Sequence, residues 1–112
     1  MRTNSQGSLG GTVVEVKPTG GKLYWAEASN GGTVTTWIQF FDLAAADVVL
    51  GTTAPKISLA VPKGASPTDT GIMDKDWAKD ITFENAISVA ATTAPANGTG
   101  AAVALRANFG FQ

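Results

Sequence analysis

Residues 22–42 read KLYWAEASNGGTVTTWIQFFD, and this stretch decides the fold. Both halves are rich in aromatic and β-branched residues, which favour the pleated, half-buried surface of a sheet. The middle, Ser29–Gly32, contains Asn-Gly and Gly-Gly pairs, which supply the positive φ that a tight turn needs. We therefore predict a hairpin with strands at Lys22–Ala28 and Thr33–Asp42.

Further short strands are predicted on either side of this hairpin. Each is a run of apolar or β-branched residues that is bounded by proline, glycine or asparagine. In the strands predicted at Lys56–Pro62 and Ala101–Phe111, apolar residues recur at every second position, so the larger apolar side chains lie on one face. The predicted strands are Thr12–Lys17, Lys56–Pro62, Asp80–Glu84, Ala86–Thr92 and Ala101–Phe111.

Helix is scarce in this sequence. Leu43–Asp47 contains the only alanine run that indicates a helical turn. Lys63–Lys79 is predicted to be an irregular charged loop, within which Asp74–Asp80 can close one turn of helix. No segment supplies a helix for a βαβ crossover. About seven to eight short strands at this spacing predict an all-β, single-domain antiparallel β-sandwich, either immunoglobulin-like or jelly-roll-like.

The chain has 112 residues, which is the size of one domain. We expect the polar, glycine-rich residues 1–10 to form a flexible N-terminal arm and residues 11–112 to form the β-sandwich domain. In an assembly, this arm can instead lie on a neighbouring subunit. Apolar residues make up 44% of the chain and charged residues only 15%. The sequence can therefore bury a core, and its low charge is typical of a protein packed against a partner.

The composition excludes several kinds of site. Histidine and cysteine are absent, which excludes His-based triads, thiol catalysis, disulfides and Cys-type zinc sites. The net charge is −1 and there is no basic run, which disfavours nucleic-acid binding. No apolar window is long enough to span a membrane, and the first residues lack the apolar core of a secretory signal. We expect a protein that is not an enzyme and has no cofactor and no metal centre.

The acidic stretch Asp74–Asp80 is the remaining candidate for chemistry. An EF-hand loop that starts at Asp74 needs glycine at its sixth position, where this chain has Lys79. It also needs glutamate at its twelfth position, where this chain has Asn85. The match fails, and the interspersed lysines indicate a solvated charged loop. Binding of a cation by another geometry stays open.

The three tryptophans, Trp25, Trp37 and Trp77, allow three interpretations. They can belong to the core, contact a partner protein, or form a platform on which sugar rings stack. The predicted hairpin brings Trp25 and Trp37 together as a cross-strand pair. Tyr24, Ile38 and Phe40 have an equal claim to the core, and if these three face inward, the tryptophan pair lies on the opposite side, as a patch for a partner. The predicted partner-binding residues are Trp25, Trp37, Arg2, Asn4 and Gln6.

Three short sequence patterns follow one another in a fixed order between Leu23 and Thr93. A strand that ends in Ser-Asn leads through a glycine turn into an aromatic-Ile-Gln-Phe-Phe-Asp segment, here Ser29–Asp42. A strand that starts at proline then ends in a Val-Pro-x-Gly-x-Ser turn, here Pro55–Ser66. A Phe-x-x-Ala-Ile segment with small residues follows, here Phe83–Thr93. This pattern resembles a group of small virion proteins of tailed bacteriophages. The chain departs from that group at Ala86, where glycine is common, and in the unusually charged insertion Asp74–Asp80.

The resemblance implies a β-sandwich that serves as a structural component of the virion, such as a capsid decoration (cement) protein. We expect such a protein to be made in the host cytoplasm and to bind the major capsid protein on the outer surface of the phage head. Binding to the mature shell stabilises it by mass action, and a homotrimer fits the local three-fold positions of the shell. Two alternatives stay open: a tail-, fibre- or neck-associated virion protein, and a carbohydrate-binding β-sandwich module.

Overall fold

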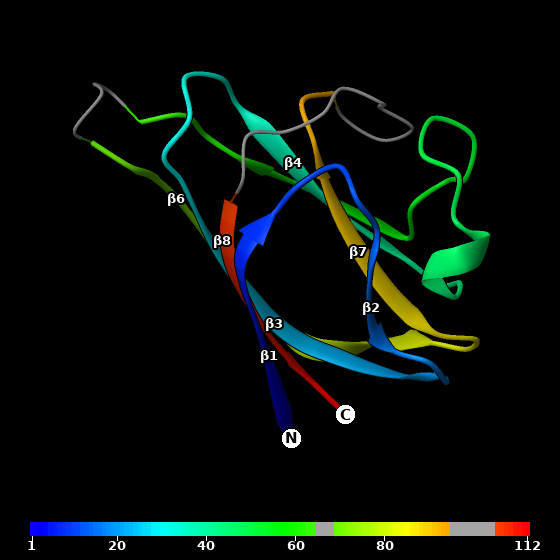
Figure 1. Ribbon diagram of the computed structural model, residues 1–112. Helices are drawn as coiled ribbons and strands as arrows, with labels where there is room; N and C mark the ends of the chain where they lie inside the picture. The colour runs from blue at the N-terminus through cyan, green and yellow to red at the C-terminus, as the bar shows by residue number, and fades with distance from the viewer. Residues whose placement is uncertain (65–68, 95–104) are drawn as a thin grey trace.

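The computed structural model describes residues 1–64, 69–94 and 105–112. In these ranges the predicted single-domain antiparallel β-sandwich is confirmed, with eight strands in two four-stranded sheets and one short 3₁₀ helix (Figure 1). The elements are β1 (Arg2–Leu9), β2 (Val14–Lys17), β3 (Gly21–Asn30), β4 (Thr36–Phe41), η1 (Ala45–Asp47), β5 (Ile57–Val61), β6 (Gly71–Phe83), β7 (Ile87–Thr92) and β8 (Leu105–Phe111).

The strands pair in the order of a jelly roll. Sheet I has the order β1-β8-β3-β6, and sheet II has the order β2-β7-β4-β5. Each strand in the first half of the chain pairs antiparallel with its counterpart in the second half: β1 with β8, β2 with β7, β3 with β6 and β4 with β5. The chain is therefore one long hairpin whose arms are rolled into two facing sheets, as in jelly rolls. Of the two topologies predicted, the jelly roll is the one observed.

The hairpin predicted for residues 22–42 is wrong. β3 and β4 lie in different sheets, and the connection between them crosses the edge of the sandwich (Figure 1). The fully buried side chain of Asn30 organises this crossing. Its Nδ2 donates to the carbonyls of Val34 at 2.9 Å and Val61 at 3.1 Å, and its Oδ1 accepts from the N–H of Gly32 at 2.8 Å. The polar turn residues thus serve an arch between the sheets.

Two segments predicted to be irregular are edge strands of sheet I. Residues 2–9, expected to be a flexible arm, form β1 along β8, and Leu9 is fully buried. Most of the loop predicted at Lys63–Lys79 that the structure describes belongs to β6, which pairs with β3. The predicted helical turn at Asp74–Asp80 is absent. Both polar segments are held in extended form by backbone pairing with a neighbour whose apolar face is buried.

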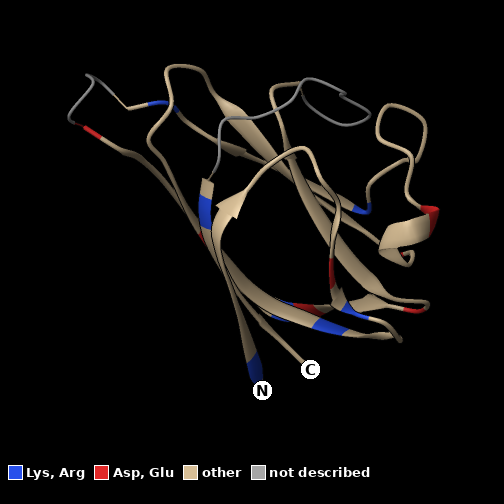
Figure 2. Cartoon of the chain, viewed as in Figure 1, with Lys and Arg blue, Asp and Glu red and all other residues tan. Residues whose placement is uncertain are grey.

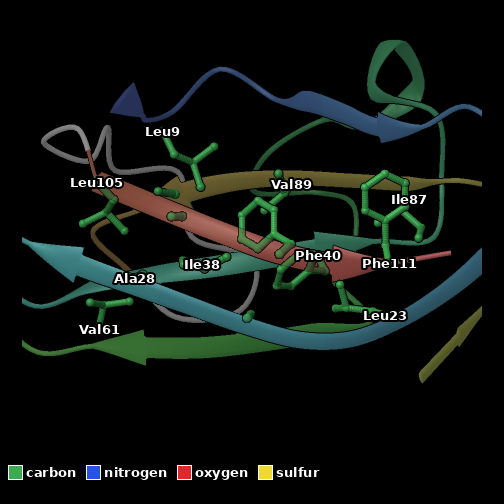
Figure 3. Packing of buried hydrophobic residues seen from close by; sticks show 14 of the residues in the cluster. Leu9, Leu23, Ala28, Ile38, Phe40, Val61, Ile87, Val89, Leu105 and Phe111 are labelled. Carbon is green, nitrogen blue, oxygen red and sulfur yellow. The ribbon is translucent and has the colours of Figure 1, made fainter. Parts of the chain in front are cut away.

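The core lies between the two sheets, where alternate side chains of facing strands meet (Figure 3). Phe40 from sheet II meets Phe109 from sheet I edge to face, with ring centroids 5.0 Å apart and ring planes at 81°. Met73, Trp77 and Ile81 of β6 are partly buried against the margin of this cluster. The face of the last strand predicted to be apolar is confirmed for the part described, with Leu105, Ala107, Phe109 and Phe111 pointing inward.

Several other predictions agree with the structure. The predicted helical turn appears as η1, and the strands predicted at Thr12–Lys17, Lys56–Pro62 and Ala86–Thr92 correspond to β2, β5 and β7. The end of the predicted Pro62–Ser66 turn, most of the loop after Thr92 and the beginning of the last strand lie outside the described residues. In the part that the structure describes, no helix is long and apolar enough to cross a membrane.

Candidate functional site

The outer face of sheet II is covered by the chain itself. By strand alternation, Gln39, Phe41, Ser88 and Ala90 point away from the core, yet all four are fully buried. The segment that follows β4, including η1, lies beside β7 (Figure 1). Ser88 Oγ donates a hydrogen bond to the carbonyl of Leu43 at 2.9 Å. This face is therefore largely withdrawn from solvent and offers little surface to a partner.

The outer face of sheet I lacks such a cover among the described residues. We call it the open face. Its side chains are mostly small and polar, and they are exposed or half-buried except where Trp25 covers the sheet. The open face consists of Thr3, Ser5 and Gly7 from β1, Arg106, Asn108 and Gly110 from β8, Trp25, Glu27 and Ser29 from β3, and Ile72, Asp74 and Asp76 from β6.

Trp25 lies flat on the open face, over Gly110 of the neighbouring strand. A Cβ added at Gly110 would collide with Nε1 of Trp25, and it would lie 2.5 Å from Cε2 and 2.6 Å from Cδ1 of the same ring. Nearly equal distances to the two carbons that flank the nitrogen place this point above the ring plane, because a point in the plane would be farther from both carbons. One side of the five-membered ring is therefore pressed against the sheet. Trp25 is half-buried as a whole, so part of the indole is exposed to solvent on this face and can stack on a ligand.

Three carboxylates adjoin Trp25. Asp76 is opposite Trp25 across the β3–β6 pair, and Asp74 is opposite Glu27. Together these four residues line a shallow hollow of about 320 Å³. Asn108 Nδ2 donates a hydrogen bond to Glu27 Oε1 at 3.1 Å, which orients that carboxylate beside the ring. This end of the open face thus combines an aromatic surface with hydrogen-bond acceptors.

The other end of the open face has a different character. Arg106 is opposite Ser29 across the β8–β3 pair, and Ile72 is opposite Ser29 on the other side. The Ile72 side chain is 70% exposed, the largest exposure among the large apolar side chains of the described residues. Arg106 and Ile72 line one hollow together with Asn108. The open face therefore runs from an aromatic and acidic end to a basic and apolar end.

The predicted partner-binding residues are not brought together. Trp25 is on the open face, whereas Trp37 is half-buried on the outer face of sheet II, between Ala60 and Thr92. The predicted cross-strand pair of Trp25 and Trp37 is wrong, because their strands lie in opposite sheets. Of the three residues with an equal claim to the core, Ile38 and Phe40 lie in it, whereas Tyr24 is half-buried and its hydroxyl donates to Gln112 Oε1.

The three N-terminal residues predicted to bind a partner lie neither on the open face nor on the outer face of sheet II. Arg2, Asn4 and Gln6 alternate with Thr3 and Ser5 along β1, so they point away from the open face. Gln6 Nε2 donates to Asn4 Oδ1 at 2.8 Å, and both side chains are partly buried. Arg2 is exposed.

Sequence reasoning missed most of the open face. Arg106 and Asn108 had a signal, because they alternate with the apolar residues of the last strand and must point outward. Asp74, Asp76 and Ile72 had none, because their segment reads as a charged loop. Only the pairing of β6 with β3 places them beside Trp25.

The chemistry available on the open face is that of binding through stacking and hydrogen bonds. Among the described residues, no group of three or more acidic side chains is arranged to hold a metal ion. Comparisons with protein-family models, with curated proteins and with solved structures found no match to this chain.

Proposed function

We propose that this protein is a structural component of a tailed-phage virion that binds the outer surface of the head through its open face. In this proposal it is a capsid decoration protein, it acts by binding rather than catalysis, and its partner is the major capsid protein. The observation that carries the proposal is the contrast between the two outer faces. One is largely withdrawn from solvent by the chain itself, while the other has no such cover among the described residues and carries a flat tryptophan between charged side chains.

Two further observations support this proposal. The segments that resemble small phage virion proteins correspond to β4, β5, β7 and the connections around them, and these three strands make up most of sheet II. The jelly roll is also an architecture found among viral capsid domains. A fold alone does not define a function, and the open face is therefore the feature on which the proposed role depends.

Gold-labelled antibody imaging of the intact virus that encodes this chain tests the location. We expect label spread over the head shell. Label confined to the tail or neck would reject the decoration role and favour a tail-, fibre- or neck-associated component. Heads that lack the protein are also expected to release their DNA at a lower temperature, because a ligand of the mature shell stabilises it.

A pair of tryptophan variants tests the contact surface. Trp25→Ala is expected to leave the circular dichroism spectrum unchanged and to weaken binding to undecorated heads at least tenfold, because large aromatic side chains dominate interface energetics. Trp37→Ala is the matched control, because the same side chain is removed from the opposite outer face. We expect this folded control to bind heads as wild type does. Equal binding by the wild type and Trp25→Ala would remove the open face from the proposal.

Carbohydrate binding is the second candidate, and the geometry of Trp25 is what favours it. A flat indole with carboxylates and an amide at its margin can stack on a sugar ring and accept hydrogen bonds from its hydroxyl groups. Jelly rolls also occur among lectins. A glycan array probed with the purified domain decides: binding that Trp25→Ala abolishes would establish this function, and the absence of binding would remove it.

A further inference from the structure

β1 is the least protected edge among the strands that the structure describes. β2 has only four residues and an irregular register, and β5 has five residues between Pro55 and Pro62. β6 carries alternating charges and a wide bulge opposite Tyr24. Such short strands, prolines, charges and bulges are the features that prevent edge-to-edge pairing of sheets. β1 has eight residues, no proline and a single charge at Arg2 (Figure 2). Its one register shift lies between Gln6 and Leu9, near the C-terminal end of the strand, and leaves Arg2–Gln6 regularly paired with β8.

The direction of the backbone groups in β1 follows from its partner. Lys22 and Gln112 exchange both backbone hydrogen bonds, so the backbone groups of Gln112 point toward β3. The N–H and C=O groups of successive residues in a strand point alternately to its two neighbours. Since those of Gln112 point toward β3, those of Phe111, Phe109 and Ala107 point toward β1.

This alternation assigns the two sides of β1. Phe111, Phe109 and Ala107 are opposite Arg2, Asn4 and Gln6, which are the β1 residues that bond to β8. The N–H and C=O groups of Thr3 and Ser5 must therefore point to the free edge, where no described strand pairs with them.

We propose that β1 pairs antiparallel with β1 of a second copy of this chain, about a two-fold axis at Ser5. In this register Ser5 is opposite Ser5 of the second copy, Thr3 is opposite Gly7, and Asn4 is opposite Gln6. No like charges face each other, because Arg2 is opposite Ser8. Sheet I of each copy then continues into one eight-stranded sheet, and the two open faces become a single surface.

Charge decides between β1 and the other long edge. The same two-fold operation on β6, centred at Lys75, would place Asp74 opposite Asp76 twice, and like charges that face each other across a strand pair are destabilising. Pairing through β6 brings like charges together and pairing through β1 does not, which points to β1 as the edge through which copies associate. The dimer is two-fold, unlike the homotrimer expected from the symmetry of the shell, and it does not depend on the proposed function.

Sedimentation velocity of the purified full chain over a series of concentrations tests the proposal. We expect a concentration-dependent monomer–dimer equilibrium. Ser5→Pro removes the N–H that points to the free edge and spares the bonds from β1 to β8. The central pair loses two backbone bonds, each equivalent to about a fivefold change in the equilibrium constant, so dimerisation should weaken about 25-fold.

The matched control is Ser5→Ala, which removes the hydroxyl group and keeps the N–H. It should dimerise as wild type does, and thermal unfolding by circular dichroism verifies that both variants remain folded. A wild type that stays monomeric at every concentration overturns the proposal. So does a wild type that sediments as a trimer, or a Ser5→Pro variant that is folded and associates with unchanged affinity.

Discussion

Gly110 is the residue that allows Trp25 to lie flat on the open face. Every other residue type carries a Cβ, and at this position the Cβ would meet the indole ring directly. The position of Trp25 therefore depends on a glycine from a strand that is distant in sequence. Asp42 likewise fixes a segment that is distant in sequence, because its carboxylate accepts hydrogen bonds from the backbone between β6 and β7.

Gly110→Ala is expected to lift Trp25 off the sheet. The tryptophan emission should shift to longer wavelength, the indole Nε1–H resonance of Trp25 should move, and the free energy of unfolding should fall by about 1 kcal/mol as ring burial is lost. Gly7→Ala is the matched control on the same face, because a Cβ at Gly7 meets nothing within 4 Å. Identical spectra for Gly110→Ala and wild type would contradict this arrangement.

The Asp42 carboxylate links the start of the segment after β4 to the β6–β7 connection. Burial raises the pKa of Asp42, but hydrogen bonds from the backbone N–H groups of Glu84, Asn85 and Ala86 and the charge of Lys56 outweigh it, so the pKa is lowered from its ordinary 3.8. A lowered pKa means that the folded state binds the proton less readily than the unfolded state. The resulting stability is complete above the ordinary value and is lost as the pH falls below it.

Asp42→Asn should remove this pH dependence. The variant should lose about 1–2 kcal/mol of unfolding free energy at pH 7, because neutral acceptors form weaker hydrogen bonds and the site is partly exposed. Urea unfolding at pH 7 and at about pH 3 measures both effects, and the difference between variant and wild type should shrink at the lower pH. The exposed Asp47 of η1 supplies the control Asp47→Asn. A constant difference across this range would exclude a contribution from ionised Asp42.

At the scale of elements, the arch between β3 and β4 determines that the two strands enter opposite sheets. Asn30 satisfies carbonyls from the arch itself and from the end of β5, so it fixes the arch against a strand of the other sheet. Both Nδ2 hydrogens point at backbone oxygens, and a further contact of 3.5 Å reaches Thr36 Oγ1. The position of residue 30 therefore requires a side-chain NH₂ group that can donate to two carbonyls at once.

Asn30→Asp should test the arch with almost no change in volume. The aspartate has no N–H to donate and would place a negative charge beside the carbonyls of Val34 and Val61. We expect a loss of about 2–4 kcal/mol at pH 7, as is typical of a buried charge facing unsatisfied acceptors. Thr33→Asp adds the same charge at an exposed position of the same arch and should cost less than about 0.5 kcal/mol. Chemical denaturation of both variants provides the comparison, and equal losses would refute a specific role for Asn30.

At the scale of the whole molecule, the sandwich is held by contacts between sheets that come from distant parts of the chain. Phe40 and Phe109 are both fully buried and meet across the core. One belongs to a central strand of sheet II and the other to a central strand of sheet I. This pair couples the two sheets directly.

A double-mutant cycle on Phe40→Leu and Phe109→Leu should detect that coupling. Each single variant should lose about 1–2 kcal/mol of unfolding free energy through imperfect repacking. The coupling energy should be about 0.5–1.5 kcal/mol, the range for aromatic pairs beyond their burial. Phe83→Leu combined with Phe109→Leu serves as the control pair, since Phe83 is a buried aromatic residue with no ring contact to Phe109 among the described residues. Additive losses for Phe40 and Phe109 would exclude the coupling.

The sequence by itself determined the all-β class and the inward face of the described part of β8, because side chains alternate between the two faces within each single strand. It did not determine which strands pair. The polar segments of β1 and β6 have no apolar alternation of their own, and they become strands only through β8 and β3. The Asn-Gly-Gly turn is compatible with both a hairpin and an arch, and the buried contacts of Asn30 with β5 select the arch. The tertiary structure alone decided that Trp25 and Trp37 lie on opposite faces and that acidic residues of β6 adjoin Trp25, because pairing across sheets depends on contacts between residues far apart in the chain.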